Sequence, residues 1–530
     1  MKDFYSSLLS TPLGAQWKRI GTKRRAGIVV PLFFIWSKNS LGIGEIPDIK
    51  YLIDFCKKSG FSILQLLSIN DTGFNSSPYS LQSGFAINPI YLSVKSLVGV
   101  NKNLLEEKRK KALKEINKNN SRVNYYGVKN LKLMVFWEIF KKGADLNLIA
   151  FKKFKKRNSY WLDSYVFYRV LKEKFNEKKW EDWPEEFKKP KKKDLIDFSK
   201  ENEKKIEFHK WLQWQLFEQL KKIKNYADKN NILLIGDFCW LMARDSADVW
   251  SNRKYFELSF DVGTPPETSD NQGQRWGFPP LSWQRVIKNN LAYTKGRLRY
   301  FENFYHISRI DHVLGIFRIW KISLKNGRGR FDPRNRAKWG DSGKKILLKM
   351  IKNTKMMLVA EDLGLIFPEC LKILNELGIL GIKVQRWFKN WKINRFVSPD
   401  DYPAFSMATI STHDTSNWAT WWKEEASKSE REQILYLSGI KNKKISFKNL
   451  IEKNLKTING SNSIFCILLL NEWLYLDNIL KKKDFEYIFN RPGTISPDNW
   501  SSKLDIPVER LINHPVTKKI KKIIQETNRY

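Results

Sequence analysis

Short runs of apolar residues, several of them β-branched, alternate along the chain with longer amphipathic stretches. That alternation is typical of an α/β fold with a parallel sheet. Apolar positions at helical spacing precede several of the runs, as at Trp211, Trp214 and Leu220 before the third. Eight runs have the length of strands: residues 27–32, 62–67, 232–237, 305–311, 356–361, 382–387, 406–412 and 463–470. The pattern predicts a (β/α)8 TIM barrel with large, mainly helical insertions.

The spacing of the predicted strands is uneven. About 165 residues separate the second strand from the third, which is too long for a simple crossover. We therefore predict a Lys-rich helical insertion at about residues 100–205, within a barrel that spans residues 26–530 after a lead-in of residues 1–25. Residues 255–283 are rich in Gly, Pro and aromatic side chains. We predict that they form a long loop above the sheet, close to the active site.

Neither membrane insertion nor cysteine chemistry is indicated. The longest apolar runs, residues 27–36 and 464–470, fall short of the ~18 to 20 residues that span a bilayer. The N-terminus lacks the basic cluster and apolar stretch of a signal peptide, so we expect a cytoplasmic protein. The cysteines are scattered without Cys-x-x-Cys spacing, which predicts neither disulfides nor a structural zinc site. They are Cys56, Cys239, Cys370 and Cys466.

The charge balance is strongly basic. Lys and Arg outnumber Asp and Glu by 95 to 55, a net charge of +40, which is the electrostatic signature of a nucleic-acid binder. The excess is spread along the chain, with 31 basic and 17 acidic residues at 101–210. No zinc finger, RNP motif or KH-type Gly-x-x-Gly accompanies it. We therefore favour a solvated helical surface over a nucleic-acid site, and docking of a partner or a membrane on this insertion is a weaker alternative.

Acidic residues recur where predicted strands end. The C-terminal ends of the strands of a β/α barrel meet at one mouth, where the chemistry of such proteins takes place. A charge at that position costs free energy unless it has a functional role or a charged or hydrogen-bonding partner. His312 and His413 adjoin two of the acids, and Arg309 should hold its neighbouring carboxylate ionised. The four acids are Asp237, Asp311, Glu361 and Asp414.

Several carboxylates around one mouth suit glycosidic-bond chemistry. One carboxyl group protonates the leaving oxygen while another attacks or assists the anomeric carbon. The sequence has neither a Cys/His ligand set nor a Gly-rich phosphate loop to suggest another reaction. Metal binding by the same carboxylates is the rival interpretation.

Seven motifs then identify a family. They are Ser-Pro-Tyr-Ser at 77–80 with Phe-Ala-Ile-Asn-Pro at 85–89, Gly-Asp at 236–237 with Asp-Ser-Ala-Asp-Val-Trp at 245–250, Gly-Gln-Arg-Trp-Gly at 273–277, Arg-Ile-Asp-His at 309–312, Ala-Glu-Asp-Leu-Gly at 360–364, Thr-His-Asp at 412–414, and Arg-Pro-Gly-Thr at 491–494 with Asn-Trp at 499–500. Over residues 25–511 the sequence resembles the amylomaltases, the 4-alpha-glucanotransferases of glycoside hydrolase family 77.

The resemblance implies a retaining double displacement without a metal or an organic cofactor. Asp311 matches the nucleophile, Glu361 the general acid/base, and Asp414 the carboxylate that grips the distorted sugar. Residues 266–283 match a loop over the cleft, with Trp276 a candidate sugar-stacking platform. We expect a raised pKa for Glu361, an ionised Asp311, and ~5 to 5.5 Å between their carboxyl groups. The implied donor-site residues are Tyr79, Asp237, Arg309, His312 and His413.

Two features depart from the usual family pattern. Cys239 stands where the family usually has a proline. Residues 276–279 and 70–72 are closer to the plant cytosolic disproportionating type and its bacterial relatives than to the short amylomaltases. That type carries N-terminal starch-binding domains, whereas here the first barrel strand begins at about Gly27. We therefore expect soluble maltodextrins or maltose as substrates.

The expected partners are an α-1,4-glucan or maltooligosaccharide donor and a sugar acceptor, with no obligate protein partner. Two alternatives stay open. Water could replace the sugar acceptor, which would make the protein an α-1,4-glucan hydrolase with the same carboxylates. A basic scaffold or nucleic-acid-binding protein on a catalytically dead barrel is an alternative of another class. Such a barrel would have no reason to keep Asp311, Glu361 and Asp414 together.

Overall fold

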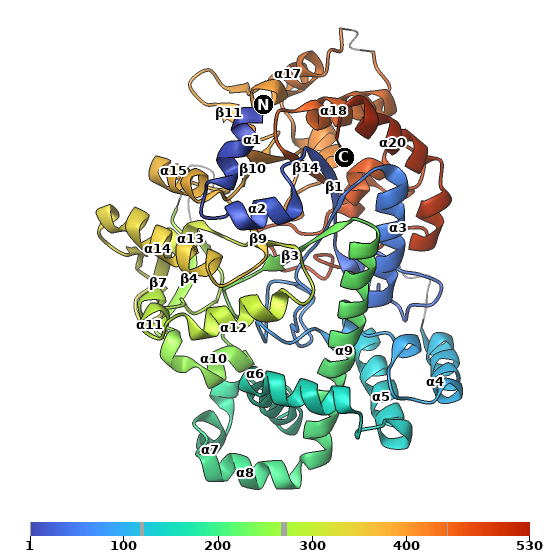
Figure 1. Cartoon of the computed structure of the whole chain (residues 1–530), viewed down its shortest axis with the longest axis vertical. Coiled ribbons are helices and arrows are strands. Elements are labelled where there is room, and N and C mark those ends of the chain that lie inside the picture. Colours follow the sequence, from blue (N-terminus) through green and yellow to red (C-terminus); the bar gives the residue numbers. More distant parts are fainter. Residues whose placement is uncertain (1, 117–120, 267–272, 442–443, 530) are drawn as a thin grey trace.

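Eight parallel strands form one sheet in the computed structural model, which describes residues 2–116, 121–266, 273–441 and 444–529 (Figure 1). Their order is β10-β13-β14-β1-β2-β3-β6-β9, and a parallel bridge between Val359 and Leu380 joins the two ends into a barrel. All eight predicted strands, and the predicted (β/α)8 barrel, are confirmed. The strands are β1 (Arg25–Val30), β2 (Ile63–Leu66), β3 (Leu233–Phe238), β6 (Ile307–Ile310), β9 (Met357–Ala360), β10 (Gly381–Val384), β13 (Ser406–Thr409) and β14 (Phe465–Leu469).

Helices cover the outside of the barrel. Every residue of β2, β6, β9, β13 and β14 is buried, which explains why these strands are continuous apolar runs in the sequence. Among the described residues, none of the helices has the length and apolar content needed to cross a bilayer. The covering helices are α3 (Ile49–Ser59), α9 (Glu203–Lys229), α12 (Ala292–Phe301), α14 (Trp339–Ile351), α15 (Pro368–Leu377), α18 (Phe447–Gly460) and α20 (Val516–Glu526).

The lead-in residues close the N-terminal end of the barrel. They form α1 (Lys2–Leu9) and α2 (Gly14–Ile20). Trp17 of α2 is fully buried, and its ring lies 6.0 Å from Phe405 and 5.9 Å from Phe465, at the starts of β13 and β14. Its indole nitrogen donates to the Gly378 carbonyl over 3.0 Å. This end is opposite the strand ends that carry the predicted acids.

The predicted insertion is helical, and residues 117–120 within it lie outside the described residues. Its helices gather in the lower part of Figure 1. On the inner side, Lys129 pairs with Asp71 at 2.9 Å, Tyr165 donates to the same carboxylate at 2.8 Å, and Lys132 pairs with Glu45 at 2.8 Å. Part of the basic charge is thus buried against the barrel loops. The helices are α4 (Lys102–Glu115), α5 (Tyr125–Gly143), α6 (Ile149–Lys174), α7 (Glu185–Lys188) and α8 (Lys192–Glu201).

The predicted loop at residues 255–283 is partly a sheet, so that prediction is wrong in part. β4 (Phe260–Thr264) and β5 (Gln274–Arg275) join β7 (Ile319–Ser323) and β8 (Gly329–Asp332) in an antiparallel sheet ordered β5-β4-β7-β8. The strands are short, and β4 pairs with β7 across more than fifty residues, so local periodicity gave no signal. Residues 267–272 of the predicted loop lie outside the described residues.

Candidate active site

The register of three neighbouring strands places the acids. Asp237 is the direct partner of Arg309 in the ladder between β3 and β6. The last pair in the ladder between β6 and β9 directly precedes Asp311 and Glu361, which therefore leave their strands side by side. The backbone N–H of Glu361 extends this ladder by donating to the Ile310 carbonyl over 2.9 Å. Three carboxyl groups thus meet at one point of the barrel mouth.

Arg309 is the central residue of this group. Its guanidinium donates to Asp237 and, over 2.9 Å, to Asp311, and it lies 3.5 Å from Glu361 Oε2. The side chains of Arg309 and Asp237 are 5% and 0% exposed, so each compensates a charge that water cannot reach. Asp311 and Glu361 stay 21% and 18% exposed. The latter two therefore face a ligand, while Asp237 and Arg309 support them.

Glu361 and Asp311 hold protons differently. Burial raises the pKa of Glu361 to about 8, against the nearby charge of Arg309, so this carboxyl group is mostly protonated at neutral pH. Burial also raises the pKa of Asp311, while Arg309 opposes the shift by its charge and by its hydrogen bond. The expected raised pKa of Glu361 is thus present. For Asp311, Arg309 acts in the expected direction, but burial outweighs it.

Tyr79 and His413 complete the support of Asp237. The Tyr79 hydroxyl donates to Asp237 Oδ2 over 2.8 Å and lies 2.6 Å from His413 Nε2. Burial lowers the pKa of His413 well below its ordinary value, and Arg309 acts in the same direction, so the ring is neutral. The single hydroxyl proton of Tyr79 goes to Asp237. Neutral His413 therefore carries its proton on Nε2 and donates it to the Tyr79 oxygen.

Asp414 follows β13 on a loop whose supports were not found in the sequence. Asn490 donates to Asp414 Oδ1 over 2.7 Å, opposing the rise in pKa that burial causes. Arg386, which follows β10, donates to the hydroxyls of the two residues after Asp414. Glu472 of α19 (Leu470–Leu474) accepts from Ser411 and from the backbone of the residue that begins α16 (Trp418–Thr420). Glu472 lies just past β14, so the strand-end criterion could have found it.

The backbone at His312 brings its N–H to Glu361. His312 has a left-handed φ of 45°, a conformation that is uncommon for a residue other than glycine and costs ~1 to 3 kcal/mol. Its backbone N–H donates to Glu361 Oε2 over 2.6 Å. Burial lowers the pKa of the His312 ring to about 4, so the imidazole is neutral. Trp276 packs edge to face on this ring at 5.0 Å.

A cleft of about 840 Å³ collects the predicted residues. The small antiparallel sheet forms one wall of it through Trp276, Trp320 and Phe331, of which the sequence indicated only the first. Three predicted residues, Asp237, Arg309 and His413, do not line the cleft and lie behind those that do. The other six line it: Tyr79, Trp276, Asp311, His312, Glu361 and Asp414.

One group in the site has the composition of a metal site. Ligand atoms of Asp237, Cys239 and Asp311 lie within 4.8 Å of one another. Arg309 already donates to both carboxylates, and burial raises the pKa of the Cys239 thiol well above its ordinary value, whereas a metal needs the thiolate. The group is therefore better matched to a guanidinium than to a metal cation.

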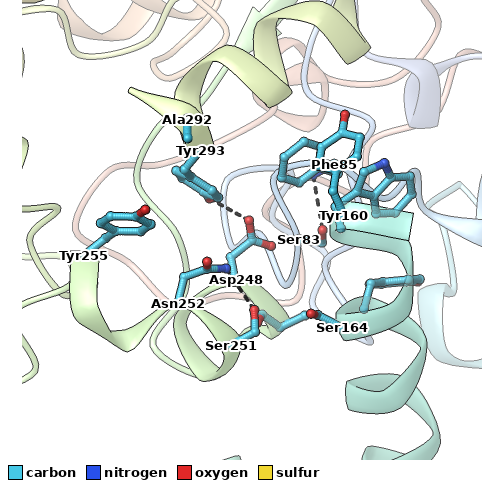
Figure 2. A pocket seen from close by; sticks show the side chains of 13 residues that line it. Ser83, Phe85, Tyr160, Ser164, Asp248, Ser251, Asn252, Tyr255, Ala292 and Tyr293 are labelled. Atoms are coloured by element: carbon cyan, nitrogen blue, oxygen red, sulfur yellow. Dashed lines mark hydrogen bonds between the residues drawn. The ribbon is translucent and has the colours of Figure 1, made fainter. Parts of the chain in front are cut away.

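A second cavity, of about 260 Å³, lies outside the barrel between α6 and α12 (Figure 2). Asp248 of α10 (Ala247–Ser251) lies at its wall and accepts hydrogen bonds from the Gly84 N–H at 3.0 Å and the Tyr293 hydroxyl at 2.6 Å. Arg297 connects the carbonyls of Gly84 and Cys239. With both Asp248 oxygens engaged by the protein, these contacts brace the cleft from the outside of the barrel.

Comparison with known proteins agrees with this geometry. The family model described as 4-alpha-glucanotransferase matches residues 30–508. The 4-alpha-glucanotransferases of Chlamydia pneumoniae and Chlamydia muridarum are 36% and 35% identical over 510 and 518 residues, covering 95% of this chain and 96% of each relative. An amylomaltase from Streptococcus agalactiae in complex with acarbose has the same fold, with a TM-score of 0.82 at 21% identity, covering 96% of this chain and 100% of that chain. Because the family match spans every acid of the cleft, the chain belongs to the 4-alpha-glucanotransferases of glycoside hydrolase family 77.

Proposed function

We propose that the chain is a 4-alpha-glucanotransferase that moves α-1,4-glucosyl or maltodextrin segments to the 4-hydroxyl of glucose or an oligosaccharide. The observation that carries the proposal is the contrast between Asp311 and Glu361. Both face one cleft and both lie near Arg309, but the guanidinium bonds to Asp311, and Glu361 holds its proton at neutral pH. A retaining reaction needs this pair of an anion and an acid.

In the first half of the reaction, a carboxylate oxygen of Asp311 attacks the anomeric carbon of the donor. The bond from that carbon to the glycosidic oxygen breaks as Glu361 gives its proton to the departing oxygen. The products are a covalent glycosyl ester of Asp311, a free sugar and an ionised Glu361. Arg309 balances the negative charge that stays between the two carboxyl groups.

In the second half, Glu361 takes the proton from the 4-hydroxyl of the acceptor. That oxygen attacks the anomeric carbon and displaces Asp311 as a carboxylate. Two inversions give net retention, and an α-1,4 bond replaces an α-1,4 bond. We predict ~5 to 5.5 Å between the two carboxyl groups, the separation of a retaining pair.

The other cleft residues have roles in holding the donor. Asn490 engages Asp414 Oδ1, and we assign Oδ2 to the hydroxyls of the sugar at the reacting centre. Trp276, at the rim beside His312, has the position of a stacking platform for the sugar chain. Tyr79, Asp237 and His413 form one hydrogen-bonded chain that keeps Arg309 and the Tyr79 ring in place.

The test is incubation of the purified protein with maltotriose, with no added cofactor, and separation of the products by size. We expect glucose together with a ladder of longer maltodextrins, and no ladder from Asp311→Asn, which keeps the shape of the side chain but is a poor nucleophile. Equal thermal unfolding of the two proteins is the control for folding. Glucose and maltose alone would identify a hydrolase, and an active Asp311→Asn variant would contradict the assigned nucleophile.

A further inference from the structure

A second groove, of about 730 Å³, lies beside the catalytic cleft. It runs along β8, the edge strand of the small antiparallel sheet, and along the segment that leads to α14. Phe331 lines both the groove and the cleft. A sugar chain that leaves the cleft on the Phe331 side therefore enters this groove.

Four exposed arginines line the groove: Arg328, Arg330, Arg334 and Arg336. The chain has 25 arginines, and these four fall within nine residues. Within the part of the chain that the structure describes, none of the four guanidiniums has a hydrogen bond or an ion pair to a protein group. The nearest acid in sequence, Asp332, pairs with Lys321 at 2.5 Å. The positive charge of the groove is thus left without a protein counter-charge.

Aromatic rings hold two of these guanidiniums. Arg330 lies 5.2 Å from the ring centre of Phe260, and Arg336 lies 5.9 Å from that of Trp339. Such cation–π contacts restrict the side chains before a ligand arrives, which lowers the entropy cost of binding. Guanidinium groups bind phosphate through paired hydrogen bonds that a neutral sugar cannot replace. The groove therefore has the chemistry of a phosphate site and the position of a subsite for the sugar chain.

We propose that this groove binds phosphate groups carried on the α-glucan whose reacting end occupies the cleft. Phosphate-bearing maltodextrins are then a favoured substrate class, and the proposal rests on the proposed glucanotransferase function. The phosphate takes no part in bond breaking. It increases kcat/KM by holding the sugar chain, and it does so through charge, so the advantage falls as salt rises.

The experiment compares kcat/KM for transfer from phosphate-bearing maltodextrins with kcat/KM for the same dextrins after phosphatase treatment. For the natural protein at low salt we expect about a tenfold preference for the phosphorylated dextrins, the effect of one charge-assisted contact. Neutralising the four arginines should bring the ratio close to one, mainly by lowering kcat/KM for the phosphorylated dextrins. The variant combines Arg328→Gln, Arg330→Gln, Arg334→Gln and Arg336→Gln.

A matched control removes the same charge elsewhere. Four lysines of α4 are exposed, and α4 lies on the other side of the molecule from β7 in Figure 1. Replacing them by glutamine should leave the preference for phosphorylated dextrins intact, which separates local contacts from the effect of net charge. The control combines Lys102→Gln, Lys110→Gln, Lys111→Gln and Lys114→Gln.

Three results would overturn the proposal. One is equal kcat/KM for the two dextrins in the natural protein, a measurement that needs no variant. Another is a preference for phosphorylated dextrins that remains after the arginine substitutions, or one that the α4 lysine substitutions abolish to the same extent as the arginine substitutions. The third is loss of RNA oligonucleotide binding by the arginine variant with an unchanged dextrin preference, which would assign the groove to nucleic acid. Failure of the proposed function would differ from all three, because neither dextrin would be a donor.

Discussion

The proton on Glu361 sets the alkaline limit of the proposed reaction. Burial raises its pKa to about 8 from an ordinary value of 4.5. At pH 7 a group with a pKa of 8 is about 90% protonated, whereas one with a pKa of 4.5 would be ~0.3% protonated. The buried position thus supplies ~300-fold more of the acid form at neutral pH. We predict that kcat/KM for maltotriose falls about tenfold per pH unit above pH ~8, because ionised Glu361 cannot protonate the leaving oxygen.

Glu361→Gln tests this assignment, since the amide keeps the shape of the side chain but has no proton to give. We expect kcat/KM for maltotriose to fall ~10² to 10⁴-fold, and the residual rate to lose its alkaline decline. For a maltosyl fluoride donor, kcat/KM should fall much less, because fluoride leaves without being protonated. Azide can serve as the acceptor in that assay, since it attacks the glycosyl ester without a general base.

Two results would refute the reasoning. An alkaline decline near pH 8 that persists in Glu361→Gln would belong to another group. An equal loss of kcat/KM for maltotriose and for maltosyl fluoride would mean that the substitution damages binding or folding and does not remove an acid. Thermal unfolding of the variant beside the natural protein checks the folding explanation.

Three further substitutions test the supports of the site. Arg309→Lys keeps the charge but loses the guanidinium, whose Nη1 donates to both Asp237 and Asp311 while its Nη2 lies 3.5 Å from Glu361, so kcat should fall ~10 to 100-fold in steady-state assays, and an unchanged kcat would contradict its central role. Tyr79→Phe removes the hydroxyl that donates to Asp237, and kcat/KM should fall about tenfold at a nearly constant melting temperature; no loss would count against the hydrogen-bonded chain. Burial raises the pKa of Glu472 to about 7, above its ordinary 4.5, so the folded protein binds this proton more tightly than the unfolded chain and stability falls as pH rises through that window. The melting temperature of Glu472→Gln should therefore fall less between pH 5 and 8 than that of the natural protein, and an equal fall would show that Glu472 does not titrate in this range.

Local pattern was sufficient to predict the barrel and the acids at its mouth. The barrel strands are almost wholly buried, so each had to be a short apolar run, and such runs are visible without knowledge of their neighbours. Asp311 and Glu361 could be predicted because each directly follows a barrel strand, and Asp414 because it lies on the loop after β13; these strand ends meet at the same mouth, whatever the order of the strands. The family motifs added the role of each acid.

The antiparallel sheet at the rim was not visible in the sequence. β5 has two residues and β8 has four, with a single apolar side chain, Phe331, in the latter. Their pairing depends on strands far apart in the chain, which no local window contains. The cleft wall and the arginine groove both depend on this sheet, so neither could be placed before the tertiary structure was known.

The sequence by itself determined which residues the barrel would carry at its mouth. Only the tertiary structure decided that Asp237 would pair with Arg309, that Arg386 and Glu472 would hold the loop of Asp414, and that Glu361 would keep its proton. The physical reason is that hydrophobic periodicity shows only which side chains of each segment are buried and which are exposed to water. Strand register, distances between charges and the exclusion of water from a carboxyl group arise only when distant segments pack together.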